Sequence, residues 1–203
     1  MKSSTSPIFF WRETGPHGYL SQWSPHPFTS PASSATSSSA ATFETAEHYM
    51  MHGKALLFSD TLTALSILQT SSPRSVKALG RKVAPFDEAV WTAERENIVR
   101  EGNLLKFRAH PDLRAALLAT GDRELAEASP RDRVWGIGYS PDKAPHTNRS
   151  AWGLNLLGKV LMQVREELRR EEETGEETGE ETGEETGEGK AKEDEGKKTT
   201  AEA

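Results

Sequence analysis

Glu47 and Lys54 carry opposite charges seven residues apart, in a segment whose pattern predicts a helix from Thr45, its N-cap, to about Phe58. Seven residues make two helical turns, which places both side chains on the same face. A carboxyl and an amine on one face could line one pocket and take part there in acid and base chemistry. The same spacing also suits a charge pair on the exposed face of an amphipathic helix, and the pattern alone leaves both interpretations open.

Asp132 is the second candidate for chemistry, because Trp135 follows it by three residues and two glycines, at 136 and 138, come after that tryptophan. Gly136 and Gly138 allow a ligand to approach the backbone closely. A core tryptophan beside an exposed loop aspartate is the alternative interpretation. Arg81 follows a glycine at the expected end of a helix, where its guanidinium could pair with phosphate oxygens.

Other chemistries are excluded by residues that the sequence lacks. With no cysteine, there is no disulfide framework, thiolate zinc site or thiol nucleophile. Neither a Gly-x-Ser-x-Gly motif nor a phosphate-binding glycine-rich loop occurs, which argues against serine hydrolases and P-loop enzymes. The six histidines do not have the spacing of a zinc protease, so we predict neither a metal nor another cofactor. The histidines are His17, His26, His48, His52, His110 and His146.

Charge is distributed unevenly along the chain. Residues 171–203 hold 14 acidic and four basic side chains, whereas residues 1–170 hold 17 acidic and 21 basic ones. A mildly basic body permits a phosphorylated ligand but falls short of the basic stripe of a protein held to nucleic acid mainly by charge. No apolar run is long enough for a membrane span, and the first residues lack the apolar core of a signal peptide. We expect an intracellular protein without a membrane partner, in the cytoplasm or the nucleus.

The elements that must position these residues follow from periodicity and from turn residues. The pattern predicts an α+β, mostly helical single domain with a few short strands. Strands are predicted at 8–11 and 134–138, a short turn at 124–128, and helices at 45–58, 61–68, 72–80, 86–106, 111–119 and 154–169.

Low-complexity segments surround and interrupt this domain. We predict a flexible N-terminus over residues 1–7, a domain over 8–170 and, between two strands, a serine-rich mobile insertion over 30–42. Residues 171–203, which repeat Glu-Glu-Thr-Gly four times, are predicted to be a disordered acidic tail, because a glycine in every repeat opposes helix formation by about 1 kcal/mol.

Four segments together resemble the NADAR, or YbiA-like, family. They occur in the family's order and spacing and cover roughly residues 8–169; they are GYLSQWSPHPF at 18–28, TAEHYMMHGKAL at 45–56, the stretch from Gly80 through Trp91 to LLKFRAHPDLRAALLATGDRELAEASPRDRVWGIG ending at 138, and NLLGKVLMQVREEL at 155–168. Each motif alone is weak, but four in register make a strong match.

The resemblance implies an enzyme that hydrolyses the N-glycosidic bond between ribose C1′ and a base nitrogen. Some members are similar to N-glycosidases of phosphoribosylated intermediates in riboflavin synthesis, and others remove ADP-ribose from guanine in nucleic acid. The sequence leaves both substrates open, as well as the oligomeric state. The alternative function belongs to a different class: a binding module that recognises ADP-ribose-like ligands without catalysis.

The resemblance also assigns roles to single residues. It implies that Glu47 is the acid/base group, that Lys54 attacks C1′ of an opened ribose to form a Schiff base, and that Asp132 contacts the ribose or the attacking water. Glu47 lies in a first helical turn, which favours its carboxylate, so burial would have to outweigh the helix dipole before it donates a proton. The expected substrate-binding residues are Gly18, Gln22 (where many members have Asn), Arg81, Trp91, Trp135 and Gly136.

Overall fold

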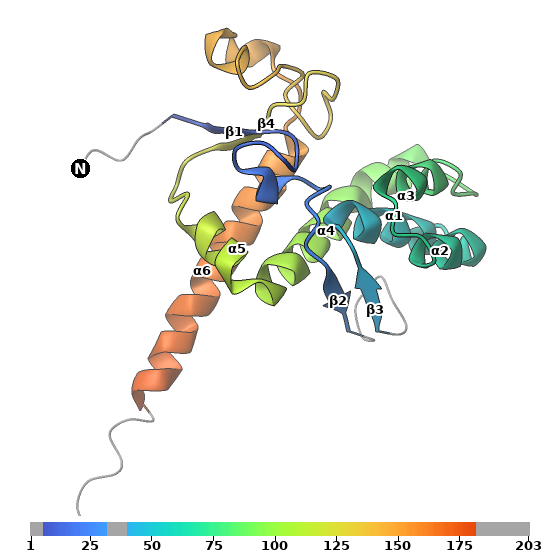
Figure 1. Cartoon of the computed structure of the whole chain (residues 1–203), viewed down its shortest axis with the longest axis horizontal. Helices are drawn as coiled ribbons and strands as arrows, with labels where there is room; N and C mark the ends of the chain where they lie inside the picture. Colours follow the sequence, from blue (N-terminus) through green and yellow to red (C-terminus); the bar gives the residue numbers. More distant parts are fainter. Residues whose placement is uncertain (1–5, 32–39, 182–203) are drawn as a thin grey trace, which may run out of the picture. The chain divides into compact units, whose positions relative to one another are not determined.

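The computed structural model describes residues 6–31 and 40–181 of the chain (Figure 1). Four short strands are β1 Ile8–Phe10, β2 Phe28–Ser30, β3 Ala41–Phe43 and β4 Leu125–Glu127. The helices are α1 Ala46–Leu57, α2 Thr61–Leu68, α3 Pro73–Gly80, α4 Glu88–Ala109, α5 Pro111–Leu118 and α6 Leu156–Glu181, with 3-10 turns η1 Gly18–Leu20, η2 Ala144–His146 and η3 Arg149–Ala151. The described residues up to Arg169 belong to one compact unit, and the predicted α+β, mostly helical class is confirmed.

Side-chain caps explain why the helices begin where they do. The Thr45 hydroxyl accepts the backbone N–H of His48 at 3.1 Å at the start of α1. Asp60 accepts the N–H of Thr63 at 3.1 Å at the start of α2. Each cap satisfies one of the N–H groups that a helix leaves without an internal partner. These local signals are readable in the sequence, and the predicted starts of α1 and α2 agree with the structure to within one residue.

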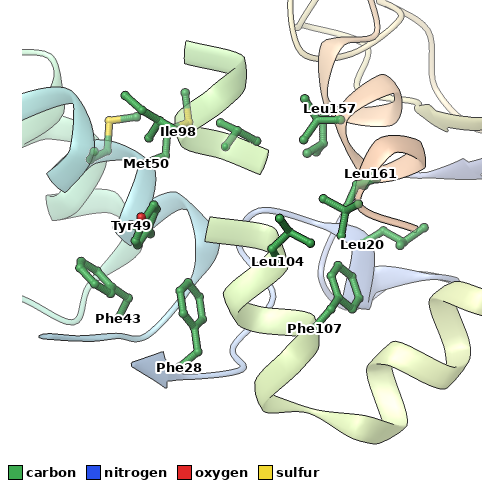
Figure 2. Close-up of a cluster of buried hydrophobic side chains, with 14 of the residues drawn as sticks. Leu20, Phe28, Phe43, Tyr49, Met50, Ile98, Leu104, Phe107, Leu157 and Leu161 are labelled. Carbon is green, nitrogen blue, oxygen red and sulfur yellow. The ribbon is translucent and has the colours of Figure 1, made fainter. Parts of the chain in front are cut away.

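Helix α1 lies at the centre of the domain and packs against α2, α3 and α4. Most of its residues are buried, including the polar Glu47, His48 and His52. Figure 2 shows how the core continues from α1 across α4 to α6, with Leu20, Phe28, Phe43, Tyr49, Met50, Ile98, Leu104, Phe107, Leu157 and Leu161 labelled. A helix surrounded on several sides holds its side chains rigidly, which suits it to present catalytic groups.

Gly102 lets α4 approach α1 closely. A Cβ atom at this position would lie 2.6 Å from Cδ1 of Tyr49, which is fully buried. We expect Gly102→Ala to lower the free energy of unfolding by about 1–3 kcal/mol through overpacking. Urea denaturation followed by circular dichroism measures this change. The sign of the change in the free energy of unfolding decides the question, because alanine in an unconstrained helix is more stable than glycine by about 1 kcal/mol. A variant that is more stable than the wild type would contradict the close contact.

The strands form two separate pairs. β1 pairs with β4 in parallel, with Ile8 opposite Leu125, and β2 pairs with β3 in antiparallel register, with Phe28 opposite Phe43. The predicted strand at 134–138 is wrong, and so is the predicted turn at 124–128, which contains β4. The backbone N–H groups of Val134 and Trp135 bond to the side chain of Asp132, and that of Ile137 bonds to the carbonyl of Glu127 at the end of β4; these isolated bonds do not make a strand ladder.

Two predicted boundaries are also corrected. The segment 30–42 was expected to be mobile throughout, but Ser30 and Thr42 belong to paired strands; residues 32–39 lie outside the described part. The last helix does not stop at Arg169, because α6 continues to Glu181 into the repeats. Adding a residue to an existing helix costs far less than starting one, and glutamate is a good helix former. The described part also leaves out the rest of the predicted acidic tail, residues 182–203, and residues 1–5 of the predicted N-terminus.

Among the described helices, none is long and apolar enough to cross a membrane.

Candidate active site

A cavity of about 680 Å³ opens where α1, α3, the segment after η1 and the loop after β4 meet. Helix α1 supplies Glu47, Met50 and Met51 from its first two turns, and the end of β4 with its following loop supplies the acidic and aromatic groups. The lining residues are Ser21, Gln22, Trp23, Glu47, Met50, Met51, Lys77, Arg81, Glu127, Ser129, Arg131, Asp132 and Trp135. Carboxyl groups, cations and aromatic rings therefore meet in one hollow of the domain.

Glu47 is a buried acid, with 7% of its surface exposed. Its backbone N–H donates to the carbonyl of Gln22 at 2.9 Å, which ties the first turn of α1 to the segment after η1. Burial is the main influence on its carboxyl group and raises its pKa; Asp132 raises the pKa further, while Lys77, Arg81 and a hydrogen bond from Trp23 lower it. A carboxyl whose pKa is raised in this way can hold and release a proton nearer neutral pH.

Asp132 is held by the backbone that follows it. Its Oδ1 accepts the N–H groups of Val134 and Trp135, each at 2.8 Å. This local turn explains the spacing of three residues between the acid and the aromatic ring. The two side chains line the same cavity in a defined relation to each other.

Gln22 is fixed by a buried amide pair. Its Oε1 accepts a hydrogen bond from Nδ2 of Asn103 at 2.9 Å, and the same Nδ2 donates to the carbonyl of Val99 at 2.8 Å. Nε2 of Gln22 points toward the sulfur of Met50, 4.0 Å away. The Gln22 side chain is therefore held firmly at the cavity wall.

Three cations line the cavity, namely Lys77, Arg81 and Arg131. The ammonium of Lys77 lies 5.6 Å from the ring centroid of Trp23, and both Lys77 and Arg81 act electrostatically on Glu47. Arginine and lysine are the usual protein ligands of phosphate, since they provide several N–H donors and a positive charge. The cavity can thus bind an anionic group beside its carboxyl groups.

Lys54 does not line this cavity. Its ammonium donates to the carbonyl of Gly80 at 3.0 Å and lies 4.3 Å from the ring centroid of Phe86 and 5.4 Å from that of Trp91. Burial lowers the pKa of Lys54, although Glu88 raises it. Two helical turns separate Lys54 from Glu47 by about 10 Å along the axis, so sharing a face does not bring the two groups into one site. Trp91, buried in the core, is likewise absent from the cavity wall.

Gly18 and Gly136 were expected to contact substrate, but the structure gives both a different surrounding. A Cβ on Gly18 would lie 2.1 Å from the carbonyl oxygen of Glu13, and one on Gly136 would lie 2.8 Å from that of Glu127. Neither glycine belongs to the residues that line the cavity. The missing side chain of Gly18 lets η1 pass close to the backbone of Glu13, and that of Gly136 lets the loop after β4 pass close to the end of β4.

The family model described as the NADAR domain matches residues 9–169. The chain belongs to the NADAR family. N-glycosidase R617 of Acanthamoeba polyphaga mimivirus is 46% identical over 128 residues, which are 63% of this chain and 75% of the viral protein. The NMR structure of Escherichia coli YbiA has a TM-score of 0.65 and 30% identity, covering 83% of this chain and 88% of that one.

A further relative of this NADAR domain is the riboflavin biosynthesis protein PYRR of Zea mays, 32% identical over 171 residues, which are 80% of this chain and 25% of the maize protein. Escherichia coli YbiA, like R617, is named an N-glycosidase. These relatives confirm the predicted family and the predicted class of enzyme, a hydrolase that acts on N-glycosyl bonds.

Of the predicted site residues, five meet at the cavity of the NADAR domain: Gln22, Glu47, Arg81, Asp132 and Trp135. Sequence reasoning missed several others, above all Trp23, Lys77 and Glu127. Lys77 lies within the predicted helix at 72–80 and nothing in its spacing distinguishes it, and Glu127 lies in the segment 124–128 that was predicted to be a turn. The apolar pair Leu125-Ala126 directly before Glu127 was the one available signal, because it could indicate a short strand, and ligands often bind beyond the C-terminal ends of strands. In the described part of the chain, no three or more His, Asp or Glu residues are grouped to hold a metal.

Proposed function

We propose that this NADAR domain hydrolyses the bond between C1′ of a phosphorylated ribose and a base nitrogen in the cavity around Glu47. The observation that carries the proposal is the buried Glu47 facing Asp132 in a cavity that also holds Lys77 and Arg81. N-glycosidase relatives support the reaction. An acid, a carboxylate and phosphate-binding cations are the groups that this hydrolysis needs.

The chemistry balances with water as the only co-reactant. Glu47 gives its proton to the base nitrogen as the C1′–N bond breaks and the bonding electrons leave with the base. Asp132 stabilises the positive charge that develops at C1′ and orients a water molecule. Water forms the new C1′–O bond, and its proton returns to Glu47. Trp135 offers a flat surface on which the base stacks.

The cations of the cavity support a phosphorylated substrate. Arg81 and Arg131 supply guanidinium groups for phosphate oxygens, and Lys77 supplies an ammonium group. The name of the maize relative favours a phosphoribosylated riboflavin intermediate, whereas the family resemblance also includes ADP-ribosyl-guanine in nucleic acid. Both substrates share a ribosyl C1′–N bond and a phosphate.

The direct test incubates the purified protein with a phosphoribosylated pyrimidine and, separately, with an ADP-ribosylated guanine oligonucleotide, and measures the released base or sugar phosphate. Turnover of either substrate, abolished in Glu47→Gln, supports the proposal and identifies the substrate. Tight binding of both without turnover would replace it with the alternative of a binding module. Weaker turnover of the oligonucleotide at higher salt is expected if its phosphates contribute to binding.

A covalent route through a lysine is the alternative to direct attack by water, and Lys77, which lines the cavity, is the lysine that would serve it in place of Lys54. In that route a lysine nitrogen bonds to C1′ of the opened ribose, the base leaves with a proton, and water later releases the sugar. Borohydride added during turnover distinguishes the two routes, because direct attack by water leaves no adduct, whereas the covalent route leaves a sugar adduct on Lys77 that peptide mass spectrometry locates. The adduct should persist in Lys54→Arg and disappear in Lys77→Arg. An adduct on Lys54 would contradict this assignment.

A further inference from the structure

Glu127 is a third acidic group at the cavity, and the reaction described above does not use it. It is the last residue of β4, and its backbone is fixed on both sides: its N–H donates to Oδ1 of Asn155 at 3.0 Å and its carbonyl accepts the N–H of Ile137 at 2.9 Å. Strand pairing and these two bonds fix the direction in which the side chain leaves the backbone. It lines the main cavity and an adjoining hollow of about 370 Å³ that also contacts Trp11 and Arg12.

One oxygen of the Glu127 carboxyl group lacks the partner that a buried structural carboxylate normally has. Its Oε2 is buried and has no hydrogen-bond partner among the described residues. Glu124, three residues earlier, forms an ion pair with Arg149 instead. A buried polar atom without a partner costs about 1–3 kcal/mol, so such an atom at a cavity wall is suited to a ligand that supplies the missing hydrogen bond.

The charges that face Glu127 favour its neutral form. Glu47 from α1 and Asp132 from the loop after β4 are both acidic, and Lys77 from α3 is the cation that opposes them. Burial is the largest influence and, together with the two acids, raises the pKa of Glu127 to about 8. Below that pH the group is a carboxylic acid that carries an O–H donor. A ligand atom that only accepts hydrogen bonds needs the O–H donor of the neutral acid. A ribose hydroxyl, in contrast, binds a carboxylate as well as it binds the neutral acid, because it can donate or accept.

We infer that Glu127 acts as a neutral hydrogen-bond donor that holds a carbonyl oxygen or an unprotonated ring nitrogen of the departing base. The inference rests on the proposed function and adds a residue to it. This hydrogen bond strengthens as the base takes up the electron pair of the broken C1′–N bond, because negative charge then accumulates on the accepting atom. Glu127 keeps its own proton throughout, and Glu47 remains the group that transfers one.

Two substitutions at Glu127 separate a neutral donor from a carboxylate. Glu127→Gln replaces the O–H donor with an N–H donor that does not ionise, so kcat/KM at neutral pH should stay close to that of the wild type. Glu127→Leu removes the donor and should lower kcat/KM about 10²-fold. Glu124→Gln, on the same segment but paired with Arg149, is the matched control and should behave as the wild type. Melting temperatures show which variants fold.

The pH profile adds a readout that a merely structural role would not change. In the wild type, kcat/KM should fall as the pH rises through about 8, because Glu127 then loses its donor and gains a charge. In Glu127→Gln the fall through about 8 should be absent, so that the proton on Glu47 alone sets the alkaline limb, whereas Glu124→Gln should keep the wild-type profile. A wild-type profile in Glu127→Gln, or a loss of activity there as large as in Glu47→Gln, would overturn the inference.

An infrared measurement tests the same inference without any substrate. A protonated carboxyl group has a C=O stretching band separate from that of a carboxylate, so the difference spectrum of wild type minus Glu127→Gln at pH 7 should contain the protonated band. A difference spectrum that contains only carboxylate bands would reject a neutral Glu127 even if the enzyme is active. Conversely, a wild-type protein that shows the protonated band but turns over neither substrate overturns the proposed function and leaves the neutral state of Glu127 intact.

Discussion

Glu47→Gln is expected to lower kcat/KM by about 10²–10⁴-fold, the usual range for a general acid or base. Glutamine has the same shape but no proton of suitable acidity to give to the leaving nitrogen. Because the side chain is buried and its N–H bond to Gln22 belongs to the backbone, the variant should keep its fold. Initial rates of base release, with a thermal melt of each preparation, provide the measurement.

Glu44→Gln is the matched control for this substitution. Glu44 lies three residues before Glu47, is exposed and does not line the cavity, so this change removes one negative charge without touching the site. Its rate should equal that of the wild type. A Glu47→Gln variant that turns over at a normal rate would refute the assignment of Glu47 as the acid, and the transfer of the proton would have to be sought elsewhere in the cavity.

Asp132→Asn is expected to lower kcat/KM by about 10²–10³-fold, because the negative charge that faces the developing positive charge at C1′ is lost. Asparagine keeps an oxygen that can accept the N–H groups of Val134 and Trp135, so the loop should retain its conformation. The effect should appear in kcat more than in KM, since the charge at C1′ develops only in the transition state.

The pH profile of Asp132→Asn supplies a second readout. The charge of Asp132 raises the pKa of both Glu47 and Glu127, so its removal should lower both pKa values and move the alkaline limb to lower pH. Asp142→Asn, an exposed aspartate outside the cavity, should leave rate and profile unchanged. A profile that stays in place in Asp132→Asn would show that these carboxyl groups do not interact.

The starts of the helices were determined by local sequence. The Thr45 and Asp60 caps bond to N–H groups only three residues away, so their signal needs no knowledge of the rest of the chain. The same holds for Asp132, whose turn includes Trp135 within three residues. Longer local segments, each continuous in the sequence, carried the family resemblance and through it the reaction class.

Only the tertiary structure decided which charged residues share the cavity. Helical spacing predicts a common face for Glu47 and Lys54, but two residues on one face can lie too far apart along the helix axis to line the same cavity. Lys77 lines the cavity although it belongs to a different helix, because α3 packs against α1. Likewise, β4 exists because β1, more than a hundred residues earlier, pairs with it, and this pairing brings Glu127 to the cavity. Contacts between residues distant in sequence leave no periodic trace, so the lysine at the cavity and the third acid could be found only in the folded molecule.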